Sequence, residues 1–258
     1  METKTNDVAL LLKEMHLPVM SEVYLDIISN PKYQTLSFEQ KLLMMAQKEY
    51  DSRNDHTIEK IIKKAEFSVS NANIKDINYR PDRKIDQGMI ESFKTNNYIK
   101  DGLNIIIIGP SGTGKTWISC ALGVNACEER YHVYYTRLND LSIEMERQKA
   151  LGTYQKFIKK LNKIDLLIID DFLLTPINDN DKCNLLEIME ARCNKKSTIL
   201  CAQWAVEGWY DKLSESPITD AIMDRVVNSS YKLQLFGRSL REEYSKLNQK
   251  NNGLGFAS

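Results

Sequence analysis

The sequence predicts an α/β protein in which a central parallel sheet is flanked by helices and preceded by a small all-helical domain. Three observations predict this fold. Helical periodicity dominates the first 70 or so residues, short apolar runs alternate with helix-length segments beyond Asp101, and a glycine-rich loop joins the first of these runs to a helix. The length of 258 residues corresponds to one or two domains.

The helical part comes first. Apolar residues recur at helical spacing from residue 7 to about residue 30, with a break at Leu17-Pro18. Ser37 and Gln40 have the spacing of a capping box, which predicts a helix from Phe38 to about Lys64. The polar stretch 68–83 predicts a linker. We therefore expect a helical domain over 1–70, a linker and the start of the next domain over 71–100, that domain over 101–247, and a mobile tail over 248–258.

Five apolar runs in the second domain predict strands. Three of them are nearly continuous Ile, Leu or Val, which is typical of parallel strands covered on both faces. The runs are Asn104–Ile108, His132–Thr136, Leu166–Asp170, Thr198–Ala202 and Tyr231–Leu235. Their alternation with helical segments predicts right-handed crossovers.

Composition excludes several classes of protein. Lys plus Arg and Asp plus Glu number 35 each, so the net charge is zero and gives no hint of a nucleic-acid partner. No apolar run approaches the roughly 20 residues that span a bilayer, and the first residues lack the pattern of a secretory signal. The five cysteines contain no C-x-x-C pair, which fits buried thiols in a reducing compartment. We therefore expect a cytoplasmic protein without membrane association.

The glycine-rich loop matches the phosphate-binding pattern G-x-x-x-x-G-K-[ST] at every position, between a predicted strand and an amphipathic helix. Its residues are Gly109, Pro110, Ser111, Gly112, Thr113, Gly114, Lys115 and Thr116. Such a loop turns its amides toward a phosphate chain at a helix N-terminus. Lys115 can reach the β- and γ-phosphates, and Thr116 is placed to bind Mg²⁺. The loop therefore predicts binding of ATP with Mg²⁺.

Two carboxylates end the third apolar run, about 50 residues downstream of the loop. Asp170 and Asp171 follow the segment Leu166–Ile169, and the carboxyl end of such a strand lies where ligands bind in open α/β sheets. We expect Asp170 to hold Mg²⁺ and Asp171 to orient or activate the attacking water. The alternative is a pair of solvated acids at the end of a strand.

These segments and two later ones, in order, resemble the IstB transposition helpers, which are AAA+ ATPases close to the DnaC-type helicase loaders. The later segments are 219–225, which reads TDAIMDR, and 237–241, which reads GRSLR. Upstream, 17–20, 36–39 and 76–79 also match the family pattern, so the resemblance covers roughly residues 8 to 245.

The resemblance implies an AAA+ domain and assigns further residues. Gln203 matches the polar residue that senses the γ-phosphate, Arg225 the arginine finger that acts on a neighbouring subunit's nucleotide, and Arg241 the second sensor. Asp171 stands where AAA+ proteins commonly have Glu, which implies slow or partner-dependent hydrolysis. An arginine at the γ-phosphate is worth orders of magnitude in rate. Without the resemblance, either arginine could equally belong to a surface ion pair.

A basic stripe is the best candidate for a DNA contact. Lys156, Lys159, Lys160 and Lys163 follow a spacing of i, i+3, i+4, i+7, which places them on one helix face. Arg147 and Lys149 precede them, in the segment that by resemblance holds an extra helix lining a DNA channel. The alternative for any single lysine is a solvated surface.

The leading hypothesis is thus an ATPase that assembles on duplex DNA, shares its ATP sites between subunits and delivers target DNA to a cognate transposase. The main alternative is a DnaC-type helicase loader that binds single-stranded DNA. A nucleotide-gated binding protein without useful hydrolysis belongs to a different class. A small-molecule kinase is least favoured, because no acceptor site is visible in the sequence.

Overall fold

The computed structural model of this chain describes residues 2–243, with side chains over 7–241. The expected tail at 248–258 lies outside the described residues. The chain divides into two compact units between Lys60 and Ile61, earlier than the boundary expected at residue 70. In the described part of the chain, no helix is long and apolar enough to cross a membrane.

The first unit is helical. It contains α1 (Glu2–Glu14), α2 (Pro18–Ser29), the short η1 (Pro31–Tyr33) and most of α3 (Phe38–Lys64). Pro18 occupies the first turn of α2, where its missing N–H costs nothing. The capping box is confirmed, because the Gln40 N–H donates to Ser37 Oγ at 3.2 Å and the Ser37 N–H donates to Gln40 Oε1 at 2.9 Å.

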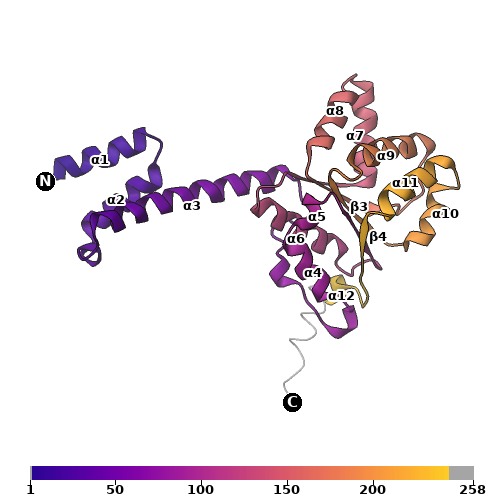
Figure 1. Ribbon diagram of the computed structural model, residues 1–258, viewed down its shortest axis with the longest axis horizontal. Helices are drawn as coiled ribbons and strands as arrows, with labels where there is room; N and C mark the ends of the chain where they lie inside the picture. Colours follow the sequence, from indigo (N-terminus) through magenta and orange to yellow (C-terminus); the bar gives the residue numbers. More distant parts are fainter. Residues whose placement is uncertain (1, 244–258) are drawn as a thin grey trace, which may run out of the picture. The chain divides into compact units, whose positions relative to one another are not determined.

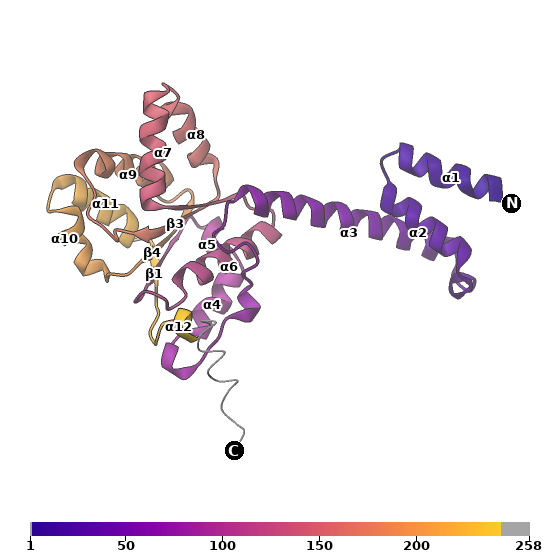
Figure 2. The same cartoon turned by 180° about the vertical axis from the view of Figure 1, so that it is seen from behind.

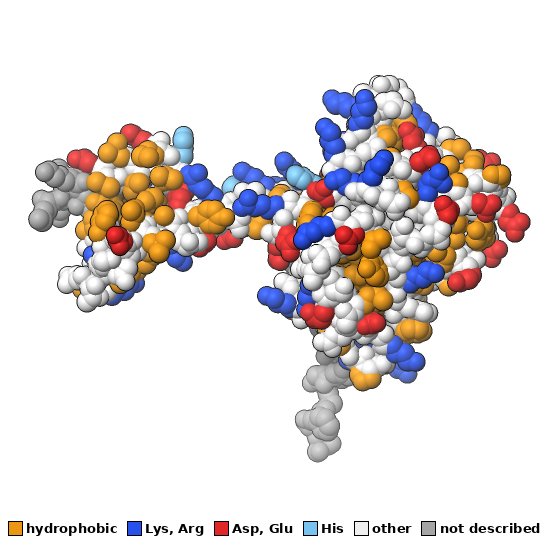
Figure 3. All heavy atoms as spheres, in the orientation of Figure 1, with side chains coloured by type: hydrophobic (Ala, Val, Ile, Leu, Met, Phe, Trp, Pro, Cys, Tyr) orange, Lys and Arg blue, Asp and Glu red, His pale blue; other side chains and the backbone are white. Residues whose placement is uncertain are grey.

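Polar contacts hold much of this unit together. The buried Glu49 carboxylate accepts hydrogen bonds from the Met20 N–H at 2.9 Å and from Arg53 Nε at 2.8 Å. The buried Ser21 hydroxyl donates to the Ala9 carbonyl at 2.8 Å. Many apolar side chains of these helices are exposed, and Figure 3 shows them spread over the surface of the unit.

The second unit is built on a parallel sheet of five strands in the order β2-β3-β4-β1-β5 (Figure 1). The strands are β1 (Asn104–Ile108), β2 (Val133–Arg137), β3 (Leu166–Phe172), β4 (Ser197–Ala202) and β5 (Ser230–Gln234). All five predicted strands are confirmed to within one or two residues at each end. The largest difference is at the end of β3, which continues past Asp170 to Phe172 with an irregular register.

Helices cover both faces of the sheet (Figures 1 and 2). One face packs against α4 (Gln87–Lys94), α5 (Asn97–Lys100) and α6 (Lys115–Glu128). The other packs against α7 (Leu138–Ala150), α8 (Tyr154–Lys163), α9 (Asp179–Arg192), α10 (Trp209–Leu213) and α11 (Pro217–Val227). Alternate residues of each strand enter the two cores, so Ile105 and Ile107 face α6 whereas Ile106 and Ile108 face the opposite helices.

The stretch 68–83 is not the solvated linker that its composition predicts. Ala72, Ile74 and Ile77 are buried in the core on the α6 face of the sheet. Just before this stretch, the Ala65 carbonyl accepts a hydrogen bond from the Tyr135 N–H of β2 at 2.8 Å. Three isolated apolar residues among asparagines do not stand out in a sequence, yet they are enough to fix the segment on the domain.

Candidate functional site

The phosphate loop runs from the end of β1 to the start of α6. Its first amide, of Gly109, donates to the Ala202 carbonyl of β4 at 3.2 Å. Gly112 and Gly114 have φ values of 79° and 92°, a region that glycine adopts without strain. The Lys115 ammonium donates to the carbonyls of Gly109 at 2.7 Å and Pro110 at 2.9 Å. The loop is thus curled around the lysine amine.

The C-terminal segment of the described chain packs directly against this loop. The Leu240 N–H, at the start of α12 (Leu240–Glu243), donates to the Gly112 carbonyl at 2.9 Å. A Cβ on Gly112 would lie only 2.1 Å from Ser239 Oγ, so no larger residue fits there. Arg241 follows one residue later and acts electrostatically on the loop. Burial is the main cause that lowers the pKa of Lys115, and Arg241 lowers it further.

Thr116 and Asp170, the two predicted metal ligands, are in contact. Asp170 is 3% exposed, and the Thr116 hydroxyl donates to its Oδ2 at 2.6 Å. Mg²⁺ prefers oxygen ligands and is commonly held by one or two protein groups together with phosphates and water. A hydroxyl beside one buried carboxylate, at the mouth of a phosphate loop, fits that requirement. Among the described residues no cluster of three or more His, Cys, Asp or Glu could hold a metal by itself.

Asp171 has a different environment from Asp170. Its φ of 51° is left-handed, which is uncommon for a residue other than glycine, and it coincides with the irregular end of β3. Burial and the neighbouring Asp170 raise the pKa of Asp171, while Arg137 opposes them. Arg137 Nε lies 3.7 Å from Asp171 Oδ2. The two adjacent carboxylates therefore differ in burial and in their partners.

Gln203 and Arg225 occupy different surroundings. Gln203 directly follows β4, next to the carbonyl that binds the first loop amide, and it is half-buried. Arg225 lies on α11, where its guanidinium donates to Glu190 of α9 at 2.9 Å and to the Ala221 carbonyl at 3.0 Å. No recorded contact in the described chain joins Arg225 to its own phosphate loop. Gln203, but not Arg225, is thus beside the loop of the same chain.

Five of the six predicted DNA-contact residues line one open hollow of about 1100 Å³ between α7, α8 and β2. They are Arg147, Lys156, Lys159, Lys160 and Lys163. With Arg137 they make six basic residues against three acidic ones, Glu66, Asp140 and Glu144, in a chain of zero net charge. Figure 3 shows Lys and Arg side chains gathered over α8.

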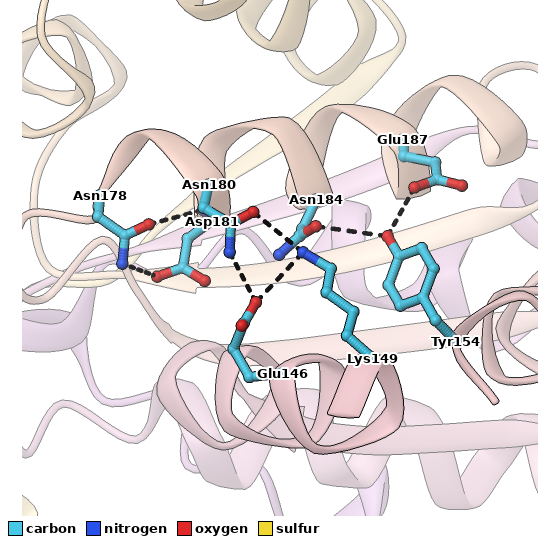
Figure 4. A network of polar contacts seen from close by, with 8 residues as sticks. All are labelled: Glu146, Lys149, Tyr154, Asn178, Asn180, Asp181, Asn184 and Glu187. Atoms are coloured by element: carbon cyan, nitrogen blue, oxygen red, sulfur yellow. Dashed lines mark hydrogen bonds and ion pairs between the residues drawn. The ribbon is translucent and has the colours of Figure 1, made fainter. Parts of the chain in front are cut away.

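Lys149 lies outside this hollow. Figure 4 shows its ammonium between α7 and α9, 3.2 Å from Glu146 and 3.0 Å from Asn180 Oδ1, with the ring of Tyr154 at 5.3 Å. Tyr154 in turn donates to Glu187 of α9 at 2.6 Å. Lys149 therefore helps to tie three helices together, in contrast to the four exposed lysines of α8.

A buried arginine anchors α8 to the sheet. Arg192 is 1% exposed and donates at 2.9 Å to the carbonyls of Leu161 and Ile164, which end α8. It also donates to Thr198 Oγ1 at 3.1 Å and to the Ser197 carbonyl at 2.6 Å, at the start of β4. Burial lowers the pKa of Arg192 to about 10. This one side chain sets where the basic face of α8 stands relative to the strands.

Three residues of this region were not predicted from the sequence. Arg83 is buried in the expected linker and donates to the Thr113 carbonyl of the phosphate loop at 2.7 Å. Tyr135 donates to Asp170 Oδ2 at 2.8 Å, and Arg137 pairs with Asp171. Nothing local marks Arg83, whereas Tyr135 and Arg137 alternate on a strand that pairs with β3 and could be found by aligning the two carboxyl ends.

Comparisons with known proteins agree with this geometry. Residues 10–248 match the family of IstB-like ATP binding proteins. An insertion sequence ATP-binding protein of Sinorhizobium fredii is 32% identical over 90% of this chain and 93% of its own length. The protein of the same description from insertion sequence IS1162 of Pseudomonas fluorescens is 30% identical over 74% of this chain and 83% of its own.

Solved structures support the same fold. The DnaC helicase loader covers 64% of this chain and 97% of its own at a TM-score of 0.53 and 18% identity. The replication initiator DnaA, bound to AMPPCP and single-stranded DNA, aligns with 75% of this chain and 59% of its own chain. The TM-score of this alignment is 0.55 and the sequence identity is 18%. At these identities the likeness concerns the fold, which is that of the AAA+ ATP-binding proteins. This chain belongs to the IstB-like ATP-binding proteins.

Proposed function

We propose that this chain is an ATPase that assembles on duplex DNA in its ATP-bound form and helps a transposase to engage target DNA. The observation that carries the DNA part is the hollow beside β2, where basic residues outnumber acidic ones two to one in a chain without net charge. The names of the relatives, ATP-binding proteins of insertion sequences, support the link to transposition.

Hydrolysis would use the residues gathered at the loop. Lys115 and the loop amides bind the β- and γ-phosphates, and Thr116 and Asp170 hold the metal. Mg²⁺ would neutralise charge on the phosphates. Asp171 orients the attacking water, and burial beside Asp170 raises its pKa, which favours it as a proton acceptor. Gln203, which follows β4, and Arg241 of α12 complete the set that contacts the γ-phosphate.

Arg225 completes the site from a second copy of the chain. It is partly exposed on α11, and its recorded partners belong to α9 and α11 rather than to the loop. A charge placed this way supports a role at a neighbour's nucleotide, which would make hydrolysis depend on assembly. We therefore propose self-association with shared ATP sites.

Binding of labelled DNA tests this function. Fluorescence anisotropy with duplex and single-stranded DNA of equal length, each with ATP, a non-hydrolysable analogue or no nucleotide, should give duplex binding that requires nucleotide. Electron microscopy of the same mixtures should show the chain assembled on the duplex. Preference for single-stranded DNA would instead favour a helicase loader. Duplex binding with no measurable turnover would favour a nucleotide-gated binding protein.

A further inference from the structure

The hydroxyl of Tyr135 is the polar end of an otherwise apolar, buried side chain. Tyr135 is 6% exposed, and its ring belongs to the core between the sheet and α6. Its oxygen reaches across to β3 and donates to Asp170 Oδ2 at 2.8 Å. A phenol in this core could be replaced by phenylalanine with little change in volume, so what distinguishes tyrosine here is this hydrogen bond.

Three donors hold the Asp170 carboxylate. The hydroxyls of Thr116 and Tyr135 both donate to Oδ2, at 2.6 and 2.8 Å, and the Asp171 N–H donates to Oδ1 at 2.9 Å. Thr116 is itself a proposed metal ligand, so its hydroxyl oxygen has to serve the metal as well. The Tyr135 hydroxyl is then the side-chain donor to Asp170 that has no other task at the metal. It therefore restrains the orientation of the carboxylate from the neighbouring strand β2.

A second residue of β2 lies beside the second carboxylate. Arg137 alternates with Tyr135 along the strand, and its Nε lies 3.7 Å from Asp171 Oδ2. The side chains of β2 thereby contact both acids at the end of β3.

We propose that Tyr135 is a positioning residue for the metal site, which holds Asp170 in the orientation that Mg²⁺ requires. This inference rests on the proposed binding of ATP with Mg²⁺. Groups that orient a metal ligand typically change metal affinity by 10-fold or more when they are removed. Loss of the Tyr135 hydroxyl leaves Asp170 Oδ2 with one donor and lets the carboxylate rotate. Binding of Mg²⁺ then has to order the carboxylate, which lowers the affinity for the metal.

Titration with Mg²⁺ tests the role directly. Full-length protein with a fluorescent ATP analogue is titrated with Mg²⁺, and binding of the analogue in EDTA is measured separately. Tyr135→Phe should raise the Mg²⁺ midpoint about 10-fold and leave the affinity in EDTA unchanged within about twofold. Electron paramagnetic resonance with Mn²⁺ and ADP should show the same weakening without any turnover. At saturating Mg²⁺ the ATPase rate of the variant should return to within about threefold of wild type, because the ligands themselves remain.

Tyr134→Phe is the matched control. Tyr134 is the adjacent residue of β2, packs on the opposite face of the sheet and makes no recorded hydrogen bond to Asp170 in the described chain. Equal Mg²⁺ midpoints for the two variants, or a loss of affinity in EDTA for Tyr135→Phe alone, would overturn the positioning role. Nucleotide binding by wild type that ignores Mg²⁺ would overturn the metal assignment itself, and with it this inference.

Discussion

Neutralising the basic face of α8 should remove most of the electrostatic part of DNA binding. The variant replaces four exposed lysines by glutamine and leaves the apolar residues of the helix in place. They are Lys156, Lys159, Lys160 and Lys163. Ile158 and Leu161, on the opposite side of α8, are buried against the sheet, so the substitutions leave the packing of the helix intact. No salt bridge is recorded for these lysines in the described chain, so no acidic partner is left unpaired.

The expected magnitude follows from the length of the stripe. At a rise of about 1.5 Å per residue, the seven steps from Lys156 to Lys163 span roughly 10 Å. One strand of duplex DNA presents a phosphate about every 3.4 Å along its axis, so the stripe covers about three phosphates. Each contact contributes about 0.9 to the slope of log affinity against log salt, which gives a total of roughly 2.7. Between 50 and 200 mM salt, the wild type should therefore lose about 40-fold more affinity than the variant.

The assay is anisotropy of a labelled duplex with a non-hydrolysable ATP analogue over a series of salt concentrations. The control is a variant of equal charge in which four exposed lysines elsewhere in the second unit are replaced by glutamine. They are Lys75, Lys100, Lys195 and Lys232. A general effect of net charge acts on both variants, whereas loss of a phosphate contact acts only on the α8 variant.

The two slopes decide the question. If the α8 variant keeps the wild-type slope, or if the control variant lowers the slope as much, then the stripe is a solvated surface and the DNA site lies elsewhere. Thermal melting of both variants within a few degrees of wild type excludes unfolding as a trivial cause.

Three further outcomes test the rest of the site. Lys115→Ala should lose ATP binding, because the phosphate charge loses its cation, and unchanged affinity by calorimetry would contradict the loop assignment. Arg225→Ala should bind ATP but not hydrolyse it, and Asp171→Asn should do likewise. Mixing the two variants should restore some ATP turnover, because a mixed interface joins one intact Asp171 to one intact Arg225. If mixed assemblies form and turnover does not recover, the ATP site is not shared between subunits. Arg192→Met should cost about 3–5 kcal/mol of unfolding free energy, because buried carbonyls lose their donor, and denaturant unfolding within 1 kcal/mol of wild type would refute that estimate.

The sheet, the loop and the carboxylates could be predicted because each has a local signal. Continuous apolar runs mark the five strands, and the loop residues have a fixed spacing. The contact between Thr116 and Asp170 follows from the rule that ligands bind at the carboxyl ends of parallel strands. The lysine spacing predicted the exposed face of α8, and burial of Ile158 and Leu161 on its other side confirms that orientation.

What escaped prediction depends on contacts between distant segments. Arg83 supports the loop from 30 residues upstream, and nothing in its own surroundings marks it. Arg192 looks like one more cation in the last turn of a helix, yet it is buried beneath α8. β3 runs past Asp170 with a register irregularity that coincides with the positive φ of Asp171, and a positive φ at an aspartate has no reliable sequence signal.

Strand β2 contributes both to the hydrogen bonds around Asp170 and to the lining of the basic hollow. It is the edge strand beside β3, and its register sets Arg137 opposite Asp170. Alternation along the strand turns Tyr135 toward the metal carboxylate and Tyr134 toward the opposite core, while both side chains also line the hollow. A ligand in the hollow would therefore contact the strand whose Tyr135 hydroxyl holds Asp170, the proposed metal ligand on β3. Because side chains in a packed core respond to any change in volume, substitutions in β2 should separate the two activities only when they remove a polar group without changing the packing, which Tyr135→Phe does.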